Sequence, residues 1–164
     1  MPDALDPLPL LRYLHERSVE HIVIGGFAVT AHGFMRVTKD LDTVPRPTDE
    51  NLTRLAGALR DLEATILDTG DFSPEELPMD PTQPADLAQG SNFCLHTSLG
   101  RMDIMQWASG IEADDLYAEL DRAAIAGDID GITVRVCGLE HLRAMKRAAG
   151  RPQDLEDLRH LEGA

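Results

Sequence analysis

The chain has 164 residues, 43% of them hydrophobic, and a formal net charge of −14 at pH 7. This length suits one domain with a substantial core, and the charge excludes a general attraction to nucleic acid or to an anionic membrane. The two cysteines, Cys94 and Cys137, have neither metal-site nor disulfide spacing, and no apolar run approaches the roughly 20 residues of a membrane span. Because the start of the chain also lacks a basic and then apolar leader, we expect a cytoplasmic protein.

The N-terminal part of the chain predicts a helix followed by a buried strand. Asp6 and Pro7 form a typical helix start, and the leucines after them, at helical spacing, predict a first helix of about ten residues. The apolar run at residues 22–24 predicts a short strand that ends at the glycine pair Gly25 and Gly26. A short helix is expected to follow that pair.

Residues 38–44 predict a second strand, which carries a pair of carboxylates. Strand alternation sends Leu41 to one face and both Asp40 and Asp42 to the other, with their Cα atoms about 6.6 Å apart. Two carboxylates so placed can share a divalent cation, because hard cations prefer oxygen ligands from carboxylates and phosphates. The preceding glycines lack a Cβ, so their backbone N–H groups can come close to an anion.

The middle of the chain predicts another helix, a short strand and a long loop. Thr48 is a typical cap for a helix with leucines at helical spacing, and residues 63–67 predict a short strand. Residues 68–91 form an acidic, proline-rich loop with single helical turns expected at 73–76 and 84–87. Two interpretations stay open for this loop. It is either a functional lid, facing a group that accepts a transferred moiety, or a solvated excursion.

Two further strands are predicted at residues 92–97 and 101–107, and they form a hairpin. The second strand contains Asp103 as its one acidic residue. A solitary aspartate in a strand usually marks a solvated face. We favour a third metal-site carboxylate, because such a ligand must lie on a strand beside Asp40 and Asp42.

The last third predicts an acidic helix, a hairpin and a pair of helices. The helix is expected at residues 113–124, and the hairpin turns at Asp130 and Gly131 before a strand at 132–136. A C-terminal helix pair is expected at residues 138–162, interrupted at Gly150. The buried stripe of its second helix is predicted to contain Leu155, Leu158 and Leu161.

Residues 25–43 resemble the signature of the nucleotidyltransferase superfamily. The resemblance consists of the glycine pair, thirteen further residues and then the run Asp-Leu-Asp-Thr at 40–43. The similarity is closest to small bacterial nucleotidyltransferase-like proteins related to abortive-infection type toxins. It implies an α/β (α+β) minimal nucleotidyltransferase fold, with a small mixed sheet flanked by helices, in a single domain over residues 1–164. It also implies that the glycine turn holds a nucleoside triphosphate such as ATP, while the aspartates of the run and Asp103 hold Mg²⁺ or Mn²⁺.

The C-terminal helix pair carries a second point of resemblance. Small toxin-like members have a lysine, a basic turn and then Asp-x-x-Asp-Leu, and the matching positions here are Lys146, Arg151, Asp154, Asp157 and Leu158. This implies that Lys146 approaches the nucleotide phosphates and that the acidic residues orient it. The alternative is a solvated salt-bridge lattice between two helices. The chain departs from many catalytic members in having Gly26 in place of a serine, and it lacks the added helical domain with which larger relatives hold an acceptor.

The predicted function is a metal-dependent transfer of a nucleoside monophosphate from a nucleoside triphosphate to a hydroxyl of RNA, protein or a small molecule, with release of pyrophosphate. The residues expected to act in catalysis and to bind the metal are Asp40, Asp42 and Asp103. Those expected to bind the substrate are Gly25, Gly26, Lys39 and Lys146. RNA would need a local basic patch, for which the candidates are Arg36 with Lys39, and Arg143, Lys146, Arg147 and Arg151.

Two other classes of function remain open at this point. The first is a catalytically inactive binding protein with the same fold, such as one component of a toxin–antitoxin pair with its protein partner. The second is a metal-dependent phosphoesterase that acts on a nucleotide, because the same acidic cluster supports hydrolysis. The glycine turn favours transfer, since hydrolysis does not require a cradle for a triphosphate.

Overall fold

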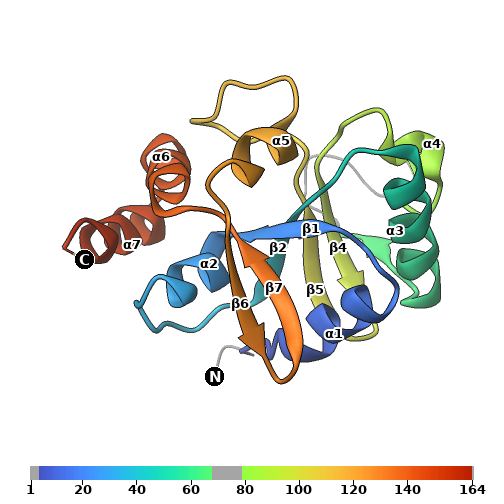
Figure 1. Ribbon diagram of the computed structural model, residues 1–164, viewed down its shortest axis with the longest axis horizontal. Helices are drawn as coiled ribbons and strands as arrows, with labels where there is room; N and C mark the ends of the chain where they lie inside the picture. Colours follow the sequence, from blue (N-terminus) through green and yellow to red (C-terminus); the bar gives the residue numbers. More distant parts are fainter. Residues whose placement is uncertain (1–3, 68–78, 164) are drawn as a thin grey trace.

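The computed structural model describes residues 4–67 and 79–163, which form one mixed sheet with helices around it (Figure 1). The sheet has seven strands in the order β3-β4-β5-β2-β1-β7-β6. In chain order these strands are β1 (His21–Ile24), β2 (Asp40–Pro45), β3 (Thr65–Ile66), β4 (Phe93–Thr97), β5 (Gly100–Ile104), β6 (Ile125–Ile129) and β7 (Ile132–Val136). The predicted α/β class, with a small mixed sheet flanked by helices, is confirmed.

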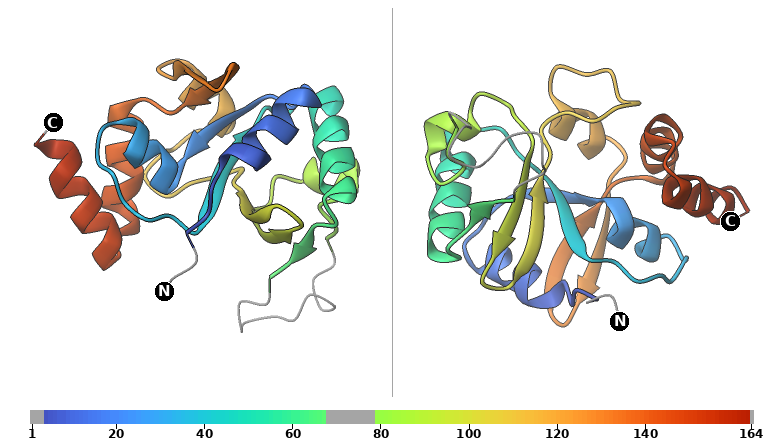
Figure 2. Two further views of the ribbon diagram at one scale, coloured as in Figure 1. Left: turned by 90° about the horizontal axis from the view of Figure 1, so that it is seen from below. Right: turned by 180° about the vertical axis from the view of Figure 1, so that it is seen from behind.

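The helices are α1 (Leu8–Glu16), α2 (Gly25–Ala31), α3 (Asp49–Asp61), α4 (Pro84–Leu87), α5 (Leu116–Asp121), α6 (Leu139–Ala149) and α7 (Pro152–Glu162). α5 contacts β1 and β2, while α1 contacts β7 and α3. α6 and α7 pack against each other at one end of the molecule, beyond α2 (Figures 1 and 2). No helix among the described residues is long and apolar enough to cross a membrane.

The centre of the sheet brings distant parts of the sequence together. β2 pairs antiparallel with β1 and parallel with β5, so residues 40–43 lie between the end of β1 and residues 101–104. Ile22, Leu41 and Ile104 are fully buried on these three strands and anchor them in the core. The polar side chains that alternate with the core residues on β2 and β5 therefore share the other face of the sheet.

Several local predictions are confirmed. Thr48 caps α3, because its hydroxyl accepts a hydrogen bond from the Asn51 backbone N–H at 3.3 Å. Asp130 and Gly131 both have positive φ, 49° and 81°, as a tight hairpin requires. Gly150 ends α6 with φ 63°, and the turn expected at 84–87 is α4. The other expected turn, at 73–76, lies outside the described residues.

Two predicted boundaries are wrong for reasons of local hydrogen bonding. The second hairpin strand ends at Ile104 instead of Trp107, because the Asn92 side chain accepts the backbone N–H groups of Gln106 and Trp107 and replaces a strand partner. The acidic helix is six residues long, Leu116–Asp121, instead of spanning 113–124. It starts late because Asp115 caps it through the Ala118 N–H.

The buried stripe of the final helix is also partly wrong. Leu158 and Leu161 are buried as predicted, but Leu155 is 48% exposed. The inward positions of α7 are Asp154, Asp157, Leu158 and Leu161, which have the 3–4 spacing of one helix face. Asp154 and Asp157 occupy inward positions that the predicted stripe did not contain, and Leu155 falls outside the stripe.

Candidate functional site

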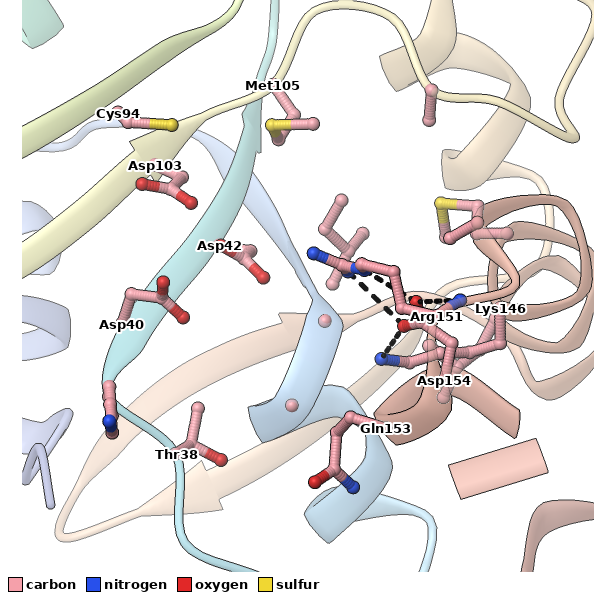
Figure 3. Close-up of a pocket in the computed structure, with 18 of the residues that line it drawn as sticks. Thr38, Asp40, Asp42, Cys94, Asp103, Met105, Lys146, Arg151, Gln153 and Asp154 are labelled. Atoms are coloured by element: carbon pink, nitrogen blue, oxygen red, sulfur yellow. Dashed lines mark hydrogen bonds and ion pairs between the residues drawn. The ribbon is translucent and has the colours of Figure 1, made fainter. Parts of the chain in front are cut away.

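Three aspartates from the two central strands converge on one spot. The parallel register of β2 and β5 sets Asp42 opposite Asp103, and Asp40 lies two residues earlier on the same face. One carboxylate oxygen from each residue lies within 4.8 Å of the others. Figure 3 shows the three side chains in a row above the strands, with Cys94 of β4 next to Asp103.

The electrostatics of this row fit a divalent cation. Burial raises the pKa of Asp42 well above its ordinary value, and the charges of Asp103 and Asp40 raise it further. Burial also raises the pKa of Asp103, with a contribution from Asp40. Asp103 Oδ1 is buried without a hydrogen-bond partner in the described part of the chain. Three neighbouring carboxylates that repel one another, one of them with an oxygen that lacks a partner, are a donor set that suits Mg²⁺ or Mn²⁺.

The glycine bend lies directly against this row. Gly25 has φ +69°, and a Cβ at this position would lie 1.9 Å from Asp42 Oδ2. Both the backbone conformation and the space therefore require glycine here. A Cβ on the next residue, Gly26, would lie 2.7 Å from Thr38 Oγ1. The bend thus presents bare backbone to the space beside the carboxylates.

A cavity of about 900 Å³ opens in front of the aspartates, and α6 and α7 contribute its opposite wall. Lys146 of α6 lines the cavity although only 6% of the residue is exposed. Its Nζ lies 3.1 Å from Asp154 Oδ1 and 2.9 Å from Asp157 Oδ2. Figure 3 shows Lys146, Asp154 and Arg151 across the cavity from the aspartate row.

The two aspartates of α7 are buried and hold further cations. Asp154 and Asp157 are 1% and 0% exposed. Arg151 Nε lies 2.7 Å from Asp154 Oδ2, and Arg36 Nε lies 2.9 Å from Asp157 Oδ1. The interpretation of these charges as a solvated lattice is therefore wrong. They form a buried ionic network that ties α7 to α6 and to the segment before β2.

All seven predicted site residues line the cavity: Gly25, Gly26, Lys39, Asp40, Asp42, Asp103 and Lys146. Their proposed roles stay predictions. Lys39 lies at the exposed margin, whereas Lys146 is held in place by its ion pairs. Two of the basic residues suggested for RNA are compensated, because Arg143 pairs with Glu140 and Arg147 pairs with Glu162.

Several other lining residues were not identified as site residues from the sequence, among them Trp107 and Thr38. Trp107, the single tryptophan of the chain, lines the cavity and is 59% exposed. Thr38 also lines it and is buried. Alternation along the predicted strand at 38–44 sets Thr38 on the face of Asp40 and Asp42, so this signal was present. Alternation along the predicted strand at 101–107 likewise set Trp107 on the face of Asp103, although β5 ends at Ile104 and Trp107 lies beyond it.

No protein-family model matches the sequence, and the comparison with curated proteins found no match. Solved structures do match. The lincosamide antibiotic adenylyltransferase LnuA, lincomycin-bound, shares 12% identity with a TM-score of 0.64 over 98% of both chains. ANT(2'')-Ia in complex with adenylyl-2''-tobramycin shares 18% identity with a TM-score of 0.55 over 93% of this chain and 83% of its own. TM1012 of Thermotoga maritima, provisionally named a nucleotidyltransferase, shares 15% identity with a TM-score of 0.56 over 97% of this chain and 95% of its own. The chain therefore has the nucleotidyltransferase fold.

Proposed function

We propose that the protein is a metal-dependent nucleotidyltransferase, which moves a nucleoside monophosphate from a nucleoside triphosphate to an acceptor hydroxyl and releases pyrophosphate. The observation that carries this proposal is the contact between the glycine bend and the acidic row, in which Gly25 leaves no room for a Cβ beside Asp42. A phosphate that approaches the bare backbone of the bend necessarily lies next to the three carboxylates. Hydrolysis of a nucleotide requires the carboxylates but gives no reason for this bend.

We assign the metal to Asp40, Asp42 and Asp103. A cation bound there would neutralise the charge of the phosphates and stabilise the attacking and leaving oxygens. Without it the carboxylates repel one another, and this repulsion adds to the larger effect of burial in raising the pKa of Asp42. We assign the acceptor proton to Asp103, because its Oδ1 has no hydrogen-bond partner among the described residues and faces a cavity large enough for an acceptor.

Lys146 is the cation best placed to hold the phosphates. Its ammonium group has three donors, of which Asp154 and Asp157 take two. The third is available to a ligand in the cavity. Because the two aspartates fix the position of the nitrogen, the ordering entropy of a long lysine side chain does not oppose ligand binding. Lys39 would contribute from the cavity margin.

We further propose that the acceptor is a small molecule and that ATP is the donor. The chain carries a net charge of −14, which disfavours RNA, and the basic residues around α6 are paired with carboxylates. Among proteins of this fold, LnuA is a lincosamide antibiotic adenylyltransferase and ANT(2'')-Ia has been solved with adenylyl-2''-tobramycin. The suggested link to toxin–antitoxin pairs, a protein partner and the cytoplasmic location stay predictions.

A labelling experiment tests this function. The protein is incubated with each α-labelled nucleoside triphosphate, Mg²⁺ or Mn²⁺ and a cell extract, which is then separated into small molecules, RNA and protein. We expect label from ATP in the small-molecule fraction, lost with a chelator and in Asp42→Asn. The matched control is Asp114→Asn, which changes the net charge equally at an exposed position outside the cavity.

Each of the other outcomes points to a different function. Asp42-dependent label on RNA or protein would keep the transferase and overturn the small-molecule acceptor. Free nucleoside monophosphate without any labelled acceptor would identify a phosphoesterase. If the protein bound no metal–nucleotide complex and labelled nothing, it would be an inactive binding protein.

A further inference from the structure

The hydroxyl of Thr38 is buried, lines the cavity and lacks a partner. Thr38 is 6% exposed, and its Oγ1 has no hydrogen-bond partner among the described residues. A buried hydroxyl without a partner destabilises a fold, so such groups usually acquire one from water or from a ligand. The position of Thr38 on the cavity wall, close to the glycine bend, points to a ligand (Figure 3).

Gly26 is a glycine because the Thr38 side chain stands over it. A Cβ at Gly26 would lie 2.7 Å from Thr38 Oγ1 and 2.8 Å from Thr38 Cγ2. Unlike Gly25, Gly26 does not have a positive φ, so other residues can adopt its backbone conformation. Space alone therefore excludes a side chain at position 26. A side chain at position 26 and the Thr38 side chain would thus compete for the same space, and in this protein the Thr38 hydroxyl and methyl groups occupy it.

A guanidinium group borders this space. Arg36 Nη2 lies 3.0 Å from the same virtual Cβ of Gly26. Arg36 is fixed by Asp157, which also binds Lys146. The Thr38 hydroxyl thus lies beside the Arg36 guanidinium as well as beside the glycine bend. The contact between Gly25 and Asp42 defines the acidic side of the cavity.

We propose that Thr38 Oγ1 donates a hydrogen bond to the pyrophosphate portion of the bound nucleoside triphosphate. This inference rests on the proposed function. The reacting phosphorus must lie at the three aspartates, so the two outer phosphates extend along the glycine bend, where Thr38 and Arg36 both lie close to Gly26. Negative charge grows on these phosphates as the bond to the departing pyrophosphate breaks, and a hydrogen bond to them strengthens with it.

Inorganic pyrophosphate tests the contact without the base or the acceptor. Binding of Mg²⁺-pyrophosphate and of Mg²⁺-α,β-methylene-ATP is measured by calorimetry and by the fluorescence of Trp107. Thr38→Val keeps the shape and removes the hydroxyl. We expect it to weaken both ligands about 10- to 100-fold, as loss of a hydrogen bond to a charged group does. Thr38→Ser, which retains the hydroxyl, is expected to recover most of the affinity.

The matched control is Thr30→Val. Thr30 Oγ1 is also buried without a partner among the described residues, but Thr30 does not line the cavity. This variant is expected to bind both ligands as the wild type does. Thermal unfolding of every variant shows whether a lost affinity reflects a lost fold.

An exchange of the hydroxyl between the two positions gives a test that does not depend on Thr38→Val. Gly26→Ser alone is expected to bind poorly, because the new side chain collides with Thr38. Combining Gly26→Ser with Thr38→Ala frees the space and supplies a hydroxyl from the other side of the same volume. We expect the combined variant to bind pyrophosphate more tightly than either single variant.

The outcomes separate the two proposals. If the wild type binds neither ligand and transfers no nucleotide, both proposals fail. If the wild type transfers nucleotide and Thr38→Val binds both ligands equally well, only the role of Thr38 is overturned. Weaker binding of the nucleotide analogue with unchanged binding of pyrophosphate would move the hydrogen bond away from the pyrophosphate portion and would also overturn the assignment.

Discussion

Replacing Asp42 with asparagine is expected to stabilise the metal-free protein while it removes the response to Mg²⁺. The ligand oxygens of Asp40, Asp42 and Asp103 lie within 4.8 Å of one another. Burial, and then the charges of the other two, raise the pKa of Asp42. Asparagine has nearly the same shape as aspartate but cannot be charged, so it removes the repulsion and the metal ligand together.

The separation of the carboxylates sets the magnitude. Two unit charges at 4.8 Å repel by about 3.5 kcal/mol at an effective dielectric constant of about 20, and by about 0.9 kcal/mol in bulk water. Asp42 takes part in two such pairs. Because the residues are partly exposed to the cavity and screened by salt, the lower part of this range applies. We expect Asp42→Asn to raise the free energy of unfolding by about 1 to 3 kcal/mol.

The gain should depend on pH in a defined direction. The pKa of Asp42 is raised in the folded protein above its ordinary value of 3.8. Below that ordinary value the carboxyl is protonated in both states and contributes no repulsion. As the pH rises through the raised pKa, the wild type loses stability relative to the variant. The stability difference is therefore expected to be absent below about pH 4 and complete at alkaline pH.

Urea unfolding in the presence of a chelator measures this difference, with Asp114→Asn as the control for net charge. If Asp42→Asn were no more stable than Asp114→Asn at alkaline pH, the carboxylates would not repel as inferred. The electrostatic argument for a metal at the three aspartates would then fail. Addition of Mg²⁺ to about 100 times its dissociation constant should then stabilise the wild type by about 2.7 kcal/mol and the variant by much less.

Three other changes probe the same site. Gly25→Ala should destabilise the protein and abolish its stabilisation by Mg²⁺ in thermal unfolding, because the new Cβ would lie 1.9 Å from Asp42 Oδ2; an unchanged melting temperature would contradict the contact. Burial, and then the charge of Asp103, raise the pKa of Cys94 to about 11, so alkylation at about pH 8 should be slow and Asp103→Asn should accelerate it, as followed by mass spectrometry. Lys146→Met should cost about 3 kcal/mol in urea unfolding, because it leaves two buried carboxylates without their shared cation; a smaller loss than for Arg147→Met, at an exposed ion pair, would refute this.

The elements that build the site could be predicted because their signals are local. The apolar run before Gly25 and the alternation around Leu41 each fit within a few residues, and they specify a strand, a bend and a second strand. Asp103 could be suggested from its strand but not paired with Asp42, because strand order and register depend on contacts between distant segments. The resemblance to a known fold supplied that missing step.

What could not be predicted depends on side chains that compete with regular structure. The Asn92 side chain accepts hydrogen bonds from two backbone N–H groups and so ends β5 early. The alternation of residues around Asn92 does not predict this. For the aspartates of α7 the sequence left open both a role in orienting Lys146 and a solvated lattice, because charged residues on a helix are usually solvated. Their burial follows only once Lys146 and Arg36 lie opposite them. The exposed Leu155 is a consequence of the same arrangement.

The distribution of charge in the cavity is compatible with the proposed binding of a nucleotide by so acidic a chain. Five basic residues, Arg36, Lys39, Arg101, Lys146 and Arg151, and four acidic ones, Asp40, Asp42, Asp103 and Asp154, line the cavity among the described residues. The cavity is thus close to neutral although the chain carries a charge of −14. Its charges lie in two groups: three neighbouring carboxylates on β2 and β5, with Arg101 4.0 Å from Asp40, and across from them Lys146 and Arg151 beside Asp154 (Figure 3). A metal–triphosphate complex has the complementary arrangement, since its cation and its outer phosphates need opposite partners. If charge alone attracted nucleotides, Asp42→Asn would bind them more tightly; because the arrangement matters, we expect it to bind the metal complex more weakly.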